Sequence, residues 1–183
     1  MEIKKIARTG LMLAITLVFQ IGFRQFAQPL VGPLVNMMLI FTTLSIGLPY
    51  AIIIGTLTPI VAFSLGIIGI FPIIPIIAIG NIAYVSIFFL MSRLIKTGTT
   101  NMKSDKTRIT KNIVSWTVSI LTASLVKYAL LYGGVMLILP LVLEKVPAPI
   151  IAAFSLPQLY TALIGGVFAI IMYELIKQRI VSR

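Results

Sequence analysis

The sequence contains no cysteine and no histidine, and only four of its 183 residues are acidic. The first two absences exclude disulfides, thiol nucleophiles, imidazole bases and metal sites built from Cys or His. The four acids lie far apart in the sequence, and they are Glu2, Asp105, Glu144 and Glu174. Three of them fall outside the apolar runs or at their edges, so paired-carboxylate catalysis and a proton relay along acids are poorly supported. We expect no catalytic residue, no metal site and no enzyme activity.

Apolar residues, by contrast, are abundant: 59% of the chain is hydrophobic and its mean hydropathy is +1.11. A soluble domain is typically just under half apolar, so this composition predicts an integral membrane protein with a single domain over residues 1–183. The formal net charge is +11. Basic residues cluster at the ends of apolar runs, which indicates membrane topology rather than nucleic-acid binding. Residues 1–27 resemble a signal peptide without a small-x-small cleavage site, and we interpret them as an uncleaved first span.

The apolar runs predict an all-α membrane protein in which six transmembrane helices form a compact bundle, because one span needs roughly 20 residues. We expect the spans at about 6–27, 33–46, 49–65, 75–95, 112–132 and 157–176. A basic loop at 97–111 separates the fourth and fifth spans. An apolar segment at 133–156 extends the fifth span, forms a short helix or caps a pocket, and the sequence leaves these three possibilities open.

The basic residues indicate the orientation of this bundle. Twelve of the fifteen lie on the side that contains both termini and the 97–111 loop, namely Lys4, Lys5, Arg8, Arg93, Lys96, Lys103, Lys106, Arg108, Lys111, Lys177, Arg179 and Arg183. Only Arg24, Lys127 and Lys145 lie on the other side. The positive-inside rule therefore predicts that both termini are cytoplasmic.

Polar residues within the spans gather in the third of the bundle nearest the outer side. The residues that we expect to bind a substrate are Gln20, Arg24, Asn36, Asn81, Tyr84, Lys127, Tyr128 and Gln158. They come from five predicted helices, and the turn at 24–36 is expected to form the rim of the pocket. Apolar walls with a few fixed polar groups are typical of ligand cavities. Two cations among several amides indicate a small ligand with a carboxylate or phosphate group.

Each of these residues also has an explanation without a ligand. Arg24 and Lys127 could extend to lipid phosphates at the interface. Asn36 and Asn81 could form hydrogen bonds between helices, each worth roughly 0.6 kcal/mol. The tyrosines could belong to an aromatic belt at the membrane surface. The sequence alone does not choose between these readings.

Small residues form a second pattern on two of the predicted spans. Ala7, Gly10 and Ala14 lie in the cytoplasmic half of the first span, where Gly10 and Ala14 form a small-xxx-small face. This face could pack within the bundle or dock a partner. In the last span, small-xxx-small pairs at 162/166 and 165/169 predict close helix packing.

With these features in place, the chain resembles the substrate-binding (S) components of energy-coupling factor (ECF) transporters, which are bacterial vitamin importers. The resemblance covers nearly the whole chain and includes the runs Pro33-Leu34-Val35-Asn36 and Ile79-Gly80-Asn81. It implies a high-affinity vitamin-binding subunit in the bacterial cytoplasmic membrane that associates with a transmembrane coupling (T) protein and two ABC ATPases. The family docks its partner through Ala-x-x-x-Ala in the first helix, and here Gly10 replaces the first alanine. No cofactor is expected in this chain, since the partner ATPases use the ATP.

Two other function classes remain as alternatives. A stand-alone secondary transporter or small efflux protein would be favoured by an acid on a pore-facing helix, and none is evident. An intramembrane hydrolase could use Ser124 and Lys127, which are three residues apart, but no strained Gly-x-Ser-x-Gly turn accompanies them. The ligand itself is not determined, because pantothenate, lipoate and nicotinate all fit on charge.

Overall fold

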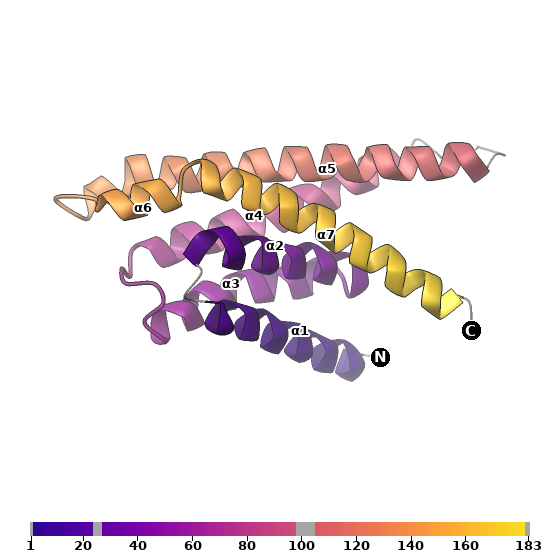
Figure 1. The fold of residues 1–183 in the computed structure, drawn as a ribbon, viewed down its shortest axis with the longest axis horizontal. Coiled ribbons are helices and arrows are strands. Elements are labelled where there is room, and N and C mark those ends of the chain that lie inside the picture. The colour runs from indigo at the N-terminus through magenta and orange to yellow at the C-terminus, as the bar shows by residue number, and fades with distance from the viewer. Residues whose placement is uncertain (1, 24–26, 98–104, 182–183) are drawn as a thin grey trace.

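Helices make up all the regular secondary structure in the residues that the computed structural model describes, which are 2–23, 27–97 and 105–181 (Figure 1). The main helices are α1 (Glu2–Gly22), α2 (Ala27–Ser45), α3 (Leu48–Ser64), α4 (Ile73–Thr97), α5 (Asp105–Gly133), α6 (Ala148–Ala153) and α7 (Leu156–Val181). A π-helical turn, η2 (Gly134–Ile138), and a 3-10 turn, η3 (Leu139–Leu141), extend α5. The all-α class predicted from the sequence is confirmed.

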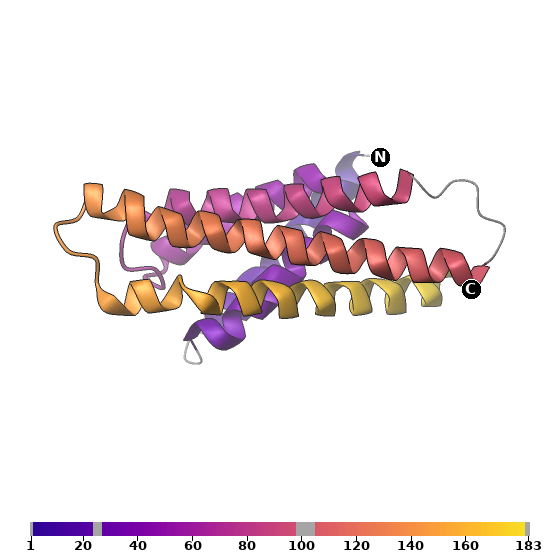
Figure 2. The same ribbon diagram turned by 90° about the horizontal axis from the view of Figure 1, so that it is seen from above.

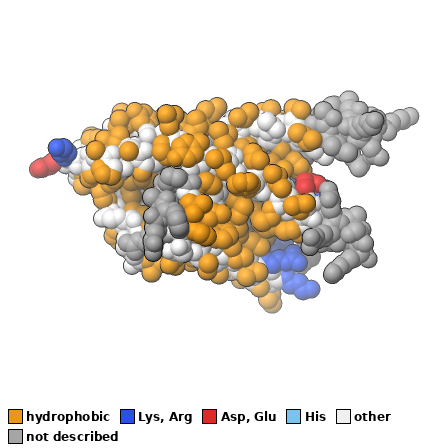
Figure 3. Space-filling model, in the orientation of Figure 1, with side chains coloured by type: hydrophobic (Ala, Val, Ile, Leu, Met, Phe, Trp, Pro, Cys, Tyr) orange, Lys and Arg blue, Asp and Glu red, His pale blue; other side chains and the backbone are white. Residues whose placement is uncertain are grey.

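Length and composition make several of these helices suitable for a membrane. Within the described residues, four stretches are long and apolar enough to cross a bilayer: Ile3–Gly22, Ile73–Ile95, Asn112–Leu141 and Ala148–Lys177. The helices α2 and α3 are apolar but shorter, with 19 and 17 residues. Figure 3 shows hydrophobic side chains over most of the visible face, with charged side chains near the two ends. These features are those of a helical membrane protein.

The helices pack around α4, α5 and α7. The most extensive helix contacts join α4 to α5 and α2 to α7, and α3 packs on α4 (Figures 1 and 2). In contrast, α1 lies at the edge against α2 and α3. Only 11% of the apolar stretch of α1 is buried, compared with 44% for α4. The start of α1 and the end of α7 lie at one end of the bundle, and α6 lies at the other (Figure 2).

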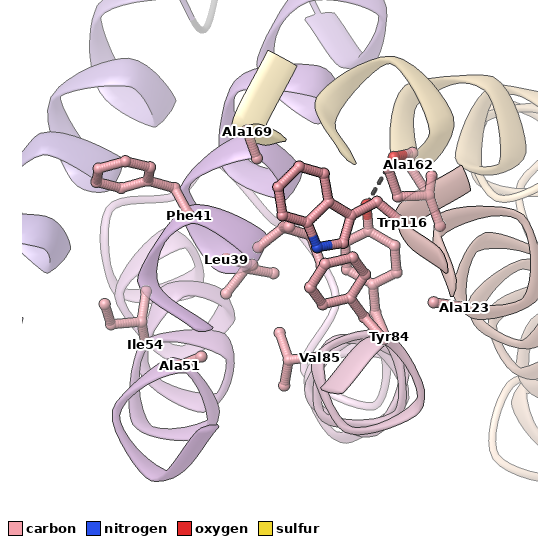
Figure 4. Packing of buried hydrophobic residues seen from close by; sticks show 13 residues of the cluster. Leu39, Phe41, Ala51, Ile54, Tyr84, Val85, Trp116, Ala123, Ala162 and Ala169 are labelled. Carbon is pink, nitrogen blue, oxygen red and sulfur yellow. Dashed lines mark hydrogen bonds between the residues drawn. The ribbon is translucent and has the colours of Figure 1, made fainter. Parts of the chain in front are cut away.

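The main hydrophobic core lies where α2, α3, α4, α5 and α7 meet (Figure 4). Leu39 and Tyr84 are fully buried there, and Trp116 is 8% exposed. The Tyr84 hydroxyl donates a hydrogen bond of 2.6 Å to the main-chain carbonyl of Ala162. This bond satisfies the polar end of a buried tyrosine and fixes α4 against α7.

Glycines bring α7 very close to its neighbours. A Cβ added at Gly165 would lie 2.5 Å from the carbonyl oxygen of Pro33 on α2. A Cβ added at Gly166 would lie 2.9 Å from Ile120 on α5. At both positions the side chain must therefore be a hydrogen atom. The small side chains of Ala162 and Ala169 on the same helix are also fully buried. The close packing predicted for the last span is therefore confirmed.

Two element boundaries differ from the predictions. The turn expected at 24–36 is too long, because α2 already begins at Ala27 and Asn36 is the tenth residue of this helix rather than in its first turn. Pro33 is tolerated inside α2 since a missing N–H removes only one hydrogen bond, that to the carbonyl of residue 29.

The consecutive glycines Gly133 and Gly134 predict a helix break at the end of the fifth span. This prediction is wrong, because both residues continue the helix. Gly134 instead permits close packing, since a Cβ there would lie 2.5 Å from Ile76. The segment 133–156 thus extends the fifth span through η2 and η3 and then forms the short helix α6.

Candidate functional site

A cavity of about 460 Å³ lies between the helices near the α6 end of the bundle. This volume is typical of a small-molecule site. Residues from α1, α2, α3, α4, α5, α6 and α7 contribute to its lining, as does the connection between α3 and α4. Most of the lining is apolar, and the polar side chains are Gln20, Asn36, Thr58, Asn81, Lys127 and Gln158. Residues far apart in the sequence therefore meet at one hollow.

Lys127 is the central polar group of the cavity. Its side chain is only 3% exposed, although it comes from the middle of an apolar stretch of α5. The ammonium Nζ donates hydrogen bonds of 2.5 Å to Oδ1 of Asn36 and of 2.8 Å to Oδ1 of Asn81. It also lies 5.1 Å from the centre of the Tyr84 ring, in cation–π geometry. Three helices, α2, α4 and α5, are joined by this network.

The environment of Lys127 contains dipoles but no opposite charge. No Asp or Glu is among the described residues that line the cavity. An ammonium group has three N–H donors, and the two asparagine oxygens accept two of them. Burial of a charge is costly without a partner of opposite sign. The third donor and the net positive charge therefore remain available to a molecule in the cavity.

Asn81 also ties the network to α3. Its Nδ2 donates a hydrogen bond of 3.0 Å to the carbonyl oxygen of Gly55. A Cβ at Gly55 would lie 3.1 Å from the Cβ of Asn81, so the glycine permits this approach. The Asn81 amide is thus oriented by the backbone of α3, with its oxygen toward Lys127. Such an oriented group needs little rearrangement when a ligand binds.

Two further polar atoms of the lining are buried without a partner among the described residues. They are the hydroxyl of Thr58, whose residue is 1% exposed, and Oε1 of Gln20. The neighbouring Thr56 instead donates to the carbonyl of Ile52 one turn earlier. Because buried polar groups are normally hydrogen-bonded, these two atoms could each bond a polar group placed in the cavity.

Five of the eight predicted substrate-binding residues line this cavity: Gln20, Asn36, Asn81, Lys127 and Gln158. Tyr84 is not in the lining and belongs to the core. Tyr128 also stays outside it and stacks on Tyr132, with 5.7 Å between the ring centres. Arg24 lies outside the described residues, so its predicted place at the rim stays a prediction.

Sequence reasoning missed the contribution of α3. Thr58 lines the cavity, yet nothing in the sequence distinguishes it from threonines that bond back to their own helix. Thr16 and Thr43 do this, at 2.6 and 2.9 Å. A threonine hydroxyl can satisfy itself locally in a helix, so only the packing of α3 reveals that this one does not.

Two apolar segments lie over the α6 end of the cavity. The connection between α3 and α4 contributes residues 67–70, and α6 with the following turn contributes Ile150, Ala153 and Phe154. Side chains from both segments pack on a second hydrophobic cluster that includes Ile73, Leu131 and Val135. The segment 133–156 therefore also covers the pocket, which was one of its three possible roles.

The three residues of the predicted docking face are all exposed. Ala7, Gly10 and Ala14 lie on the outside of α1, and a Cβ added at Gly10 would meet nothing within 4 Å. The bundle itself therefore does not use this small-residue face for its own close packing.

A second hollow of about 460 Å³ between α5 and α7 is lined by apolar residues with Thr117 and Glu174, and it lacks convergent polar groups.

Comparison of the chain with protein-family models, with curated proteins and with solved structures gave no match.

Proposed function

We propose that this protein is a membrane-embedded binding subunit that captures a small anionic solute in the cavity around Lys127. The observation that carries this proposal is a buried cation on a cavity wall, held by two amide oxygens and facing no carboxylate among the described lining residues. A bound anion would neutralise this charge and accept the third N–H of the ammonium group. Charge-assisted hydrogen bonds of this kind are stronger than neutral ones.

The proposal extends to the transport cycle that the resemblance to ECF S components implies. The chain would span the bacterial cytoplasmic membrane six times, with both termini cytoplasmic, and would open its cavity to the outside. A separate T protein and two ABC ATPases would drive release to the inside. Support comes from the exposed face of Ala7, Gly10 and Ala14, where the backbone of a partner helix could approach α1 closely.

Binding is tested with the purified protein in lipid nanodiscs, analysed by native mass spectrometry for a retained small molecule. We expect a bound acid in the wild type and its loss in Lys127→Met, because methionine has a similar shape but no charge. Lys145→Met is the matched control, since Lys145 is exposed and outside the cavity lining. Equal retention by Lys127→Met and wild type, or retention of a cationic compound, would contradict the proposal.

Docking is tested by co-expressing the chain with a T protein and two ABC ATPases of the same cell and measuring copurification. We expect Gly10→Trp to prevent assembly, because an indole would fill the space needed for close approach. Leu125→Trp is the control, since Leu125 is 54% exposed on α5, on another helix. If both variants assemble like the wild type, α1 does not provide the docking surface.

A further inference from the structure

The polar and apolar linings of the cavity are separated along the bundle axis. Lys127, Asn36 and Asn81 form one level, which we call the floor. The helices α2 and α4 begin at the α6 end of the bundle, and α5 runs in the opposite direction and reaches that end (Figures 1 and 2). Residues before Asn36 and Asn81, and residues after Lys127, therefore lie between the floor and the α6 end.

This intermediate level is apolar on every one of these helices. One turn from the floor, the lining residues are Gly32 on α2, Ile77 on α4 and Leu131 on α5. Val31 and Ile73 continue the lining toward the α6 end, and Ile68, Ile70 and Phe154 cover it. Several of these side chains belong to the second hydrophobic cluster, which includes Ile73 and Leu131. Apart from the Thr58 hydroxyl on α3, a ligand that reaches the floor meets hydrocarbon at this level.

On α3 the same level carries one polar side chain, Thr58, which lies about one turn after Gly55, and the remaining polar groups lie at the outer level. Gln20 lies near the end of α1 and Gln158 near the start of α7, both toward the α6 end (Figure 1). The Gln158 Nε2 donates a hydrogen bond of 3.1 Å to the carbonyl of Ala153, so this amide also ties α7 to α6. A group at the far end of a ligand can therefore be polar. Its middle meets a single hydroxyl, that of Thr58, and any further polar group there loses its hydrogen bonds to water.

We infer that the solute is an acid with one negative charge and an apolar body, bound with its charged group at Lys127 and its body toward α6. This inference rests on the proposed capture of an anion and specifies its class. One lysine balances one charge, which favours a carboxylate over a phosphate of nearly two charges. The cavity volume corresponds to roughly 15 water molecules, so the body must be small.

The test compares the affinities of three probes for the protein in nanodiscs. Isothermal titration calorimetry measures each affinity, with empty nanodiscs as the reference. Hexanoate and gluconate have the same number of carbons and one carboxylate, but gluconate carries hydroxyls along its chain. Hexanamide has the chain without the charge. We expect hexanoate to bind at least about tenfold more tightly than either of the others, and Lys127→Met to remove this advantage over hexanamide.

A second variant addresses the apolar level without touching the lysine. Ile77→Gln places an amide one turn from the floor, and we expect the hexanoate-to-gluconate affinity ratio to fall about tenfold. Ile79→Gln is the control, because Ile79 is 56% exposed on α4 and outside the lining.

The outcomes separate the two proposals. Equal or tighter binding of gluconate than of hexanoate overturns the apolar body and leaves anion capture intact. Equal binding of hexanamide and hexanoate, in the wild type and in Lys127→Met, overturns anion capture itself. The absence of saturable hexanoate binding overturns the inferred class.

Discussion

A negative charge added inside the cavity provides the sharpest test of the electrostatic argument. Asn36→Asp changes one amide to a carboxylate of almost the same shape, and Oδ1 of Asn36 lies 2.5 Å from the Lys127 ammonium. The substitution therefore supplies the opposite charge that the described cavity lining lacks. We expect the variant to fold and to lose its affinity for anions.

The magnitude follows from the geometry. In the wild type an incoming anion meets a net charge of +1, and in the variant it meets an ion pair. A unit charge about 4 Å away contributes about 4 kcal/mol at an effective dielectric constant of about 20. This corresponds to a loss of roughly 10³-fold in affinity. Burying the new carboxylate costs several kcal/mol, which its attraction to Lys127 largely offsets, so the free energy of unfolding should stay within about 2 kcal/mol of wild type.

The assay measures hexanoate affinity by calorimetry and thermal stability by differential scanning, both in nanodiscs. Asn36→Leu is the matched control, because it removes the same hydrogen-bond acceptor without adding charge. We expect this control to keep its hexanoate affinity within about a hundredfold of wild type, since a hydrogen bond to a charged group is worth about 1.5–3 kcal/mol. Similar losses in both variants would show that residue 36 acts through shape or contact rather than through charge, and would refute the reasoning.

The remaining predictions concern packing. Gly165→Ala should lower the free energy of unfolding by about 1–3 kcal/mol, because the added methyl would lie 2.5 Å from the carbonyl oxygen of Pro33. Gly10→Ala, where the methyl meets nothing within 4 Å, should instead raise helix stability by up to about 1 kcal/mol. Chemical denaturation of the two variants in mixed micelles measures both effects, and equal effects would contradict the close α2–α7 packing. Tyr84→Phe should cost about 1–3 kcal/mol, because the carbonyl of Ala162 loses its buried donor. The same variant should keep its hexanoate affinity, and a tenfold loss would show that Tyr84 contributes to the site.

Particular residues show how far the sequence could predict the site. The sequence alone singled out Asn36, Asn81 and Lys127. Polar groups in apolar helices cost free energy unless they have partners, and this follows from residue type and position without coordinates. Their spacing did not reveal that they bond to one another, since three different helices contribute them. Tyr84 and Tyr128 had the same polarity and predicted depth but lie outside the cavity lining. Tyr84 follows Asn81 on α4 and so lies beyond the floor, in the main core, whereas Tyr128 lies on another side of α5 than Lys127.

The sequence by itself determined the class of protein, because apolar composition and helix length depend only on which residues follow one another. It also determined where polar groups enter apolar helices. The tertiary structure decided which of them meet, since Gly55 and Gly165 allow α3 and α7 to approach close enough to bring Thr58 and Asn36 to one cavity. It also decided that the path from Lys127 to the α6 end is apolar except for Thr58, because that path is built from residues on separate helices.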